Sequence, residues 1–190
     1  MKKTYKNILV YSGGEAIGDA LYKLNFIQNL RYNFPKCKIT WLAGQGKTEY
    51  SHTLKPLVNK LLDKIIDDVE VGYKPLYELI KPNPVKEEYD VIIDTQTVLL
   101  PTLILKKIKH KVFISATAKW IFSDLKPNNF SIKNSSLNDR LNIFIKLLNN
   151  DEIKYFNGDI GLEDKYTELA SKLLPKGKPY IGIAPGPGDK

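Results

Sequence analysis

The chain has 190 residues and a formal net charge of +8, and 43% of its residues are hydrophobic. This length and composition are typical of one globular domain with a buried core, and they exclude a disordered chain. The apolar runs are too short to cross a bilayer. The single cysteine, Cys37, excludes an internal disulfide and suits a reducing cytoplasm.

The first predicted unit, residues 7–34, combines a strand, a glycine loop and a helix. Four apolar residues from Ile8 to Tyr11 are typical of a strand buried on both faces. After the small-residue loop 12–18, apolar residues recur at steps of three and four, which predicts a helix with one buried face. These residues are Ile17, Leu21, Leu24, Ile27, Leu30 and Phe34. Ligands of open α/β sheets bind at the carboxyl ends of the strands, so we expect the site over residues 12–19.

The rest of the chain alternates between strand and helix patterns. Strands are predicted at 38–43, 64–66, 89–94 and 111–115. Helices are predicted at 54–62, 76–80, 99–107, 137–147 and 162–173, with a polar loop over 119–136. The alternation favours a mostly parallel sheet covered on both faces, which is a Rossmann-like three-layer α/β sandwich.

The end of the chain has the pattern of a further strand at 180–184, followed by a glycine loop at 185–188. Such a strand either adds an edge to the first domain or begins a second domain. We favour the second interpretation, with a first domain over 1–175 and the start of another over 176–190. The natural protein is then expected to continue beyond Lys190.

The lysine-rich composition has two interpretations. One is attraction to an anionic partner, and the other is a compositional habit without a site, which we favour. The densest cluster, at 106–111, lies between a helix pattern and a strand pattern, where solvated lysines are common. Because no nucleic-acid-binding motif is found and no aromatic residues are interleaved with this cluster, we expect no nucleic-acid partner.

Several familiar sites are excluded by residue type. A dinucleotide fingerprint needs glycine where Glu15 stands and a carboxylate after the second strand, and both are absent. The glycines at 44–48 do not form a phosphate loop, because the required first glycine is replaced by Trp41. His52 and His110 have no partner at metal-ligand spacing, so we expect no metal site.

An ordered set of short motifs resembles glycosyltransferase family 9, the heptosyltransferases. The set comprises Ile8-Leu9-Val10, Ile17-Gly18-Asp19, Phe34-Pro35, Ile39-Thr40-Trp41-Leu42, the run YDVIID at 89–94 with Gln96, Asp139-Arg140, and the run YIGIAPG at 180–186. The resemblance therefore spans the chain in the order of the family. It implies the N-terminal half of a GT-B fold plus the first strand of the C-terminal half.

The resemblance also implies an activity. The family transfers heptose from a nucleotide-diphosphate sugar to the lipopolysaccharide core, with inversion and without a metal or other cofactor. It implies that Asp19 is the general base, and that the acceptor is bound by Gly13, Gly14, Glu15, Gly18, Asp94, Gln96 and Arg140. Gly186 and Gly188 are expected to begin the donor site. The acceptor is expected to be a glycan or glycolipid of the cell envelope. The resemblance implies a cytoplasmic protein that can contact the cytoplasmic face of the inner membrane, where such an acceptor is found.

Alternatives remain at each of these positions. Asp19 is also an ordinary helix-start residue, Asp94 could satisfy backbone amides in a turn, and Arg140 could be a solvated helix-start arginine. Glu15 departs from the family, which usually has a small hydroxyl residue there, and its charge is expected to repel an anionic acceptor. The second candidate function is a stand-alone module that binds a small anionic ligand or a partner protein. In either case we expect this chain by itself to lack transferase activity.

Overall fold

The computed structural model describes residues 4–71, 77–83, 85–128, 136–158, 162–177 and 179–183. The chain divides into two compact units, Met1–Asn157 and Gly158–Lys190. The boundary precedes the last helix, which the sequence analysis had placed in the first domain. The assignment of residues 1–175 and 176–190 to two domains stays a prediction.

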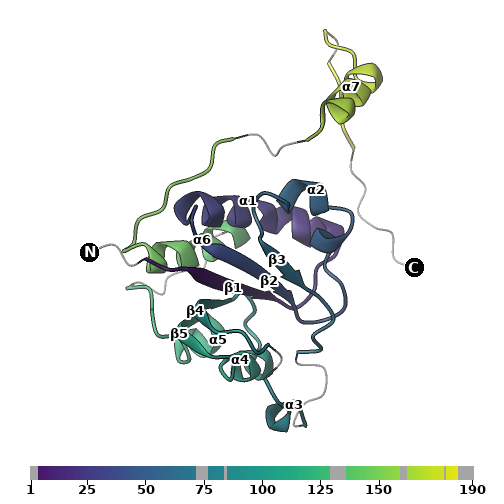
Figure 1. Ribbon diagram of the computed structural model, residues 1–190. Coiled ribbons are helices and arrows are strands. Elements are labelled where there is room, and N and C mark those ends of the chain that lie inside the picture. The colour runs from purple at the N-terminus through teal and green to yellow at the C-terminus, as the bar shows by residue number, and fades with distance from the viewer. Residues whose placement is uncertain are drawn as a thin grey trace. The chain divides into compact units, whose positions relative to one another are not determined.

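The first unit contains a five-stranded parallel sheet in the order β3-β2-β1-β4-β5 (Figure 1). The strands are β1 (Asn7–Ser12), β2 (Lys38–Ala43), β3 (Lys64–Ile66), β4 (Tyr89–Asp94) and β5 (His110–Ser115). Every pairing in this sheet is parallel, and β1 pairs with β2 on one side and with β4 on the other. The five strands predicted in this unit are therefore confirmed; β1 is longer by one residue at each end, and β5 begins one residue earlier.

The helices alternate with the strands along the chain. They are α1 (Ile17–Asn33), a 3₁₀ turn (Glu49–Ser51), α2 (Lys55–Val58), α3 (Tyr77–Ile80), α4 (Leu99–Leu105), α5 (Thr117–Trp120), α6 (Leu137–Leu148) and α7 (Asp164–Leu173). The helix predicted over 54–62 is shorter than expected, because α2 ends at Val58 and turns follow it. None of the helices in the described ranges has both the length and the apolar composition needed to cross a bilayer.

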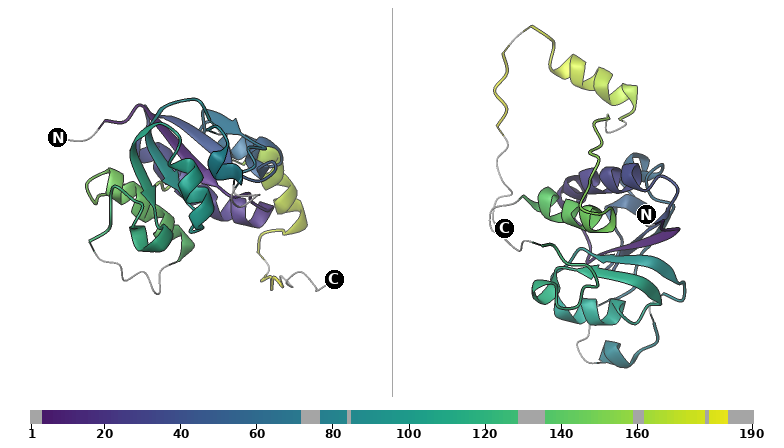
Figure 2. Two further views of the ribbon diagram at one scale, coloured as in Figure 1. Left: turned by 90° about the horizontal axis from the view of Figure 1, so that it is seen from below. Right: turned by 90° about the vertical axis from the view of Figure 1, so that its left-hand side faces the viewer.

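Two cores lie on opposite faces of the sheet because neighbouring strand residues point to opposite sides. Ile8 and Val10 of β1 pack in a cluster with α1, α2 and α6. Leu9 and Tyr11 pack in the other cluster, which includes Ile104 and neighbouring apolar residues of α4. In the right-hand view of Figure 2, α1 and α6 lie on one face of the sheet and α4 lies on the other. The expected Rossmann-like three-layer α/β sandwich is confirmed.

The buried side of α1 differs from the prediction at its first turns. Ile17 and Leu21 are each 47% exposed, although the sequence pattern placed them on the buried face. The buried side extends instead toward Phe26 and Asn29, and the Nδ2 of Asn29 donates to the Oδ1 of Asn142 in α6 at 3.1 Å. Because α6 also packs on α1, the buried arc is displaced and the first turns keep exposed apolar residues.

The segment expected to be a polar loop, 119–136, begins in a left-handed turn at residues 118–120. The φ angles of Ala118, Lys119 and Trp120 are 50°, 55° and 67°, so α5 is not a regular right-handed helix. Each such residue costs on the order of 1–2 kcal/mol relative to a right-handed conformation. The turn places Trp120, which is 3% exposed, against the Phe144 ring of α6, with the ring centroids 5.5 Å apart.

The second unit contains α7 and the extended residues 179–183. No residue is buried in α7, and Ile181 and Ile183 are 93% and 85% exposed. The strand predicted at 180–184 is not formed at residues 180–183, while residue 184 lies outside the described residues. A strand needs a neighbour that completes its backbone hydrogen bonds, and the described residues of this unit supply none.

We predict that the first unit folds without the second. Ending the chain at Asn157 removes α7 and residues 179–183, whose described side chains are all exposed. Because none of the described side chains that are removed is buried, the midpoint of thermal unfolding should change by less than about 2 °C, below the shift of about 2–4 °C that a 1 kcal/mol change gives in a domain of this size. Circular dichroism melting of both chains tests this. A drop of 5 °C or more would show that the second unit stabilises the first.

Candidate functional site

The candidate site lies where the sheet topology changes direction. The chain moves from β1 to β2 and β3 on one side and later to β4 and β5 on the other, so a crevice is expected at the carboxyl ends of β1 and β4. At this edge of the sheet, Tyr11 of β1 is paired in register with Asp94 of β4. The hydroxyl and the amide of Thr95 both donate to the Tyr11 carbonyl, at 2.7 and 3.2 Å. The loops 12–18 and 95–97 are therefore neighbours.

Asp19 lies in the first turn of α1 and is exposed. Ala16 is the N-cap residue of α1, and it forms no side-chain cap hydrogen bond. In the described part of the chain the carboxylate of Asp19 has no hydrogen bond and no ion pair. The positive end of the helix dipole favours a negative charge at this position. The side chain is thus not folded back into its own turn, and it is accessible to a ligand.

Of the three glycines Gly13, Gly14 and Gly18, the backbone requires a glycine at Gly14. Gly14 has a φ of +126°, and a Cβ there would lie 2.9 Å from the carbonyl oxygen of Gln45, so a side chain is excluded. A Cβ at Gly13 would meet the side chain of Gln96 at 3.5 Å. Nothing lies within 4 Å of a Cβ at Gly18. The start of α1 therefore faces open space beside Asp19.

Glu15 is enclosed rather than open to a ligand. Its side chain is fully buried, and its Oε2 accepts from the hydroxyl of Thr48 at 2.7 Å. Its Oε1 lies 3.5 Å from the Nζ of Lys23, which also donates to the Oγ of Ser12 at 2.7 Å. These four side chains, Ser12, Glu15, Lys23 and Thr48, are named the loop clamp below.

The loop clamp corrects two expectations about Glu15. Its carboxylate has no exposed surface for contact with an acceptor, so the expected acceptor-binding role is not available to this side chain. Its charge is also compensated by Lys23, so it does not repel an anion as expected. Lys23 was missed by the sequence analysis, although a lysine between the apolar residues of a buried helix face was a signal for it.

Asp94 is buried beneath the loop that follows β4. Its Oδ2 accepts from the hydroxyls of Thr102 and Ser115 at 2.6 and 2.8 Å, and its Oδ1 accepts from the amide of Gln96 at 3.0 Å. Burial raises the pKa of the carboxyl to about 6, although these hydrogen bonds act in the opposite direction. Asp94 is 0% exposed, so it supports the loop after β4 and does not present a surface to the acceptor.

Gln96 and Arg140 lie closer to the surface. Gln96 is half-buried beside Gly13, and Arg140 is exposed in the first turn of α6. The neighbouring Asp139 carboxylate accepts hydrogen bonds from the amide and hydroxyl of Ser136 in a capping box, so it is engaged at the start of the helix. Gly186 and Gly188, the expected donor residues, lie outside the described residues. The binding roles proposed for these residues stay predictions.

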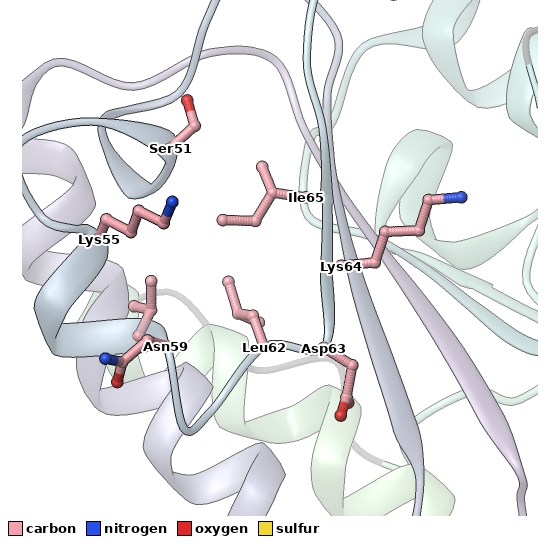
Figure 3. Close-up of a pocket in the computed structure, with 8 residues that line it drawn as sticks. Ser51, Lys55, Asn59, Leu62, Asp63, Lys64 and Ile65 are labelled. Carbon is pink, nitrogen blue, oxygen red and sulfur yellow. The ribbon is translucent and has the colours of Figure 1, made fainter.

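Among the hollows formed by the described residues, two lie beside α6 and α2. One of about 80 Å³ is lined by Thr95, Thr97, Ala116, Trp120, Leu137, Arg140, Leu141 and Phe144, and thus contains one of the predicted residues. Another, of about 380 Å³, lies between α2 and the edge strand β3 (Figure 3). Lys55 and Leu62 point into it, but it contains none of the residues predicted from the sequence.

Comparisons with known proteins bear on the fold. No family model and no curated protein matches the chain. Among solved structures, a glycosyltransferase of family 9 from Veillonella parvula matches with a TM-score of 0.56 at 18% identity, over 92% of this chain and 52% of that one.

Two structures of the E. coli heptosyltransferase WaaC match similarly. The complex with ADP-2-deoxy-2-fluoro heptose has a TM-score of 0.55 at 16% identity, over 81% of this chain and 51% of that one. The complex with ADP has a TM-score of 0.56 at 15% identity, over 82% and 51%. The chain therefore spans about half the length of these enzymes, and it has the Rossmann-like fold found in heptosyltransferases of glycosyltransferase family 9.

We predict a pH-dependent effect of Asp94→Asn. A folded-state pKa of about 6, raised from the ordinary 3.8, means that the fold favours the protonated carboxyl. The stability that this carboxyl contributes is present at low pH and is lost as the pH rises from about 4 to about 6. Asparagine stays neutral. Relative to the parent protein, the variant should gain about 2 kcal/mol of unfolding free energy between pH 4 and pH 7.

Urea unfolding of both proteins at the two pH values measures this gain. Asp90→Asn is the matched control, because Lys111 and the amides of Lys6 and Asn7 lower the pKa of Asp90. The stability from Asp90 is present above its ordinary pKa and is lost as the pH falls, so its variant should lose relative stability as the pH rises. Equal behaviour of the two variants would contradict the assignment for Asp94.

We also predict that the loop clamp is strongly coupled. Lys23→Met leaves the buried Glu15 carboxylate without its cation and should cost about 3 kcal/mol of unfolding free energy. Adding Glu15→Gln should recover part of this loss. Lys64→Met is the control, because its partner Glu87 is exposed, and it should cost less than about 1 kcal/mol. Additive effects of the two clamp substitutions in a urea double-mutant cycle would show that the pair is not coupled.

Proposed function

We propose that this chain is the acceptor-binding half of an inverting glycosyltransferase similar to family 9. The proposal rests chiefly on Asp19, an exposed carboxylate without a partner in the described part of the chain. It lies at the carboxyl edge of the central strands in a fold shared with heptosyltransferases. Shared fold does not by itself imply shared chemistry, so the site carries the functional argument.

The reaction needs one base on the acceptor side. The carboxylate of Asp19 takes the proton from an acceptor hydroxyl while that oxygen attacks the anomeric carbon of the donor sugar. The bond between this carbon and the diphosphate oxygen breaks, and the nucleotide diphosphate leaves with the electron pair. Attack from the opposite side inverts the configuration. We propose that no metal ion or cofactor takes part.

The residues around Asp19 support this role in different ways. The open space at Gly18 lets a bulky acceptor approach the start of α1. Gln96, beside Gly13, can donate to or accept from acceptor hydroxyls. The guanidinium of Arg140 suits a carboxylate or phosphate on the acceptor. The loop clamp holds the loop that leads into α1.

The donor belongs to the proposed second half. The WaaC structures contain ADP or an ADP-heptose analogue. We propose a nucleotide-diphosphate sugar as the donor here too, bound by a loop that begins at Gly186 and Gly188. The acceptor is then a lipopolysaccharide or another glycan of the cell envelope, glycosylated in the cytoplasm at the inner membrane surface. Because the chain spans half the length of WaaC, we propose that this half alone does not transfer sugar.

The proposal is tested with Asp19→Asn in a polypeptide that carries both halves. Turnover with ADP- and UDP-sugars should fall about 10²- to 10⁴-fold, the usual contribution of a general base. Acceptor binding, measured by calorimetry, should stay within about twofold. The control is Glu152→Gln, which removes an exposed carboxylate from the segment after α6. This variant should leave turnover unchanged. Unchanged turnover in Asp19→Asn would remove Asp19 from the mechanism.

A further inference from the structure

The hollow of about 80 Å³ beside α6 lies at the same edge of the sheet as Asp19. Thr95 and Thr97 come from the loop after β4, and Ala116 follows β5. Through its bonds to the Tyr11 carbonyl, Thr95 connects this hollow to the end of β1. Gln96, between the two threonines, lies against Gly13. The loop that lines the hollow therefore contacts the loops of the proposed acceptor site.

The walls of the hollow are apolar. Trp120, Leu141 and Phe144 are 3%, 2% and 4% exposed, so their side chains are held in the core and form a rigid floor. The volume is several times the 10–15 Å³ or so that one water molecule requires. An apolar cavity of this kind binds water poorly, because water finds few hydrogen-bond partners there. It is suited to a group of a few carbon atoms.

One charge lies at the rim. Arg140 lines the hollow, is exposed, and has no ion pair within the described ranges. Its neighbour Asp139 accepts from the amide and the hydroxyl of Ser136, at 3.2 and 2.8 Å, so it is engaged in the helix cap. The guanidinium is free to bind an anion whose apolar part enters the hollow. The larger hollow at α2 borders β3, at the opposite edge of the sheet from β5, and it contains none of these residues.

We propose that this hollow binds a short apolar substituent of the acceptor, carried next to a carboxylate or phosphate that pairs with Arg140. This inference rests on the proposed function and narrows its substrate class. The acceptor is then an anionic sugar with a methyl, acetyl or short acyl group, rather than a sugar that presents only hydroxyls. Burial of the apolar group and the charge of Arg140 together give the specificity.

The proposal is tested by ligand titration of the 190-residue chain, without any transfer reaction. The probes are acetate, butyrate and the neutral butanol, followed by methyl NMR of Ala116, Leu137 and Leu141. Butyrate should bind roughly tenfold more tightly than acetate, because two further methylenes are buried. Arg140→Gln should weaken butyrate about fivefold and leave butanol unchanged. Lys60→Gln removes an exposed charge from the α2–β3 connection and should change neither.

A variant that fills the hollow gives a second test. Ala116→Leu should abolish the preference for butyrate over acetate. If this variant fails to fold, the shift changes in the parent protein still decide the question. Equal binding of acetate and butyrate, or shift changes away from α6, would overturn the proposal. If butyrate binds as expected while Asp19→Asn leaves transfer unchanged, the binding role of the hollow is supported and the role of Asp19 as the base is contradicted.

Discussion

The structure depends on the parallel pairing of β1 with β2 on one side and with β4 on the other. β1 lies at the centre of the sheet, and its residues from Ile8 to Ser12 are all buried. A strand covered on both faces must be apolar, so polar chemistry is confined to its carboxyl end. There the connections diverge to opposite sides of the sheet, and the loops at 12–18 and 95–97 meet. The location of the candidate site is a consequence of this topology.

Three carboxylates near this edge have different environments. Glu15 is buried and compensated by Lys23, and Asp94 is buried among hydroxyls and has a raised pKa. Asp19 alone among these three is exposed, in the first turn of α1. Two of the carboxylates therefore hold the loops in place, because a buried polar group must be satisfied by nearby partners. The third is available to a substrate, and this difference supports its proposed role as the base.

The first turns of α1 and the hollow beside α6 both lie at the carboxyl edge of the sheet. Ile17 and Leu21 leave apolar surface exposed next to Asp19, and Trp120 and Phe144 form the floor of the hollow. The hollow has apolar walls and contains Arg140, and the proposed base Asp19 lies at the same edge of the sheet. The left-handed turn at Ala118 adds to this picture, because strained backbone of this kind is concentrated at ligand sites.

The sequence by itself determined the strands of the first unit, the parallel α/β class and the position of Asp19 at the start of a helix. These features depend on local patterns, such as the run of apolar residues at 89–94 and the spacing of apolar residues in α6. The resemblance of ordered motifs also indicated the heptosyltransferase-like fold that the solved structures show.

Only the tertiary structure decided which side chains are open to a ligand. Glu15 is 33 residues from Thr48, and Asp94 is 21 residues from Ser115, so neither partner follows from local spacing. Tertiary packing also decided the exposure of Ile17 and Leu21, through α6, and the absence of a strand at residues 180–183, through the lack of a neighbour. Burial and hydrogen bonding are set by groups that are distant in sequence, and such contacts leave no periodic pattern in the chain.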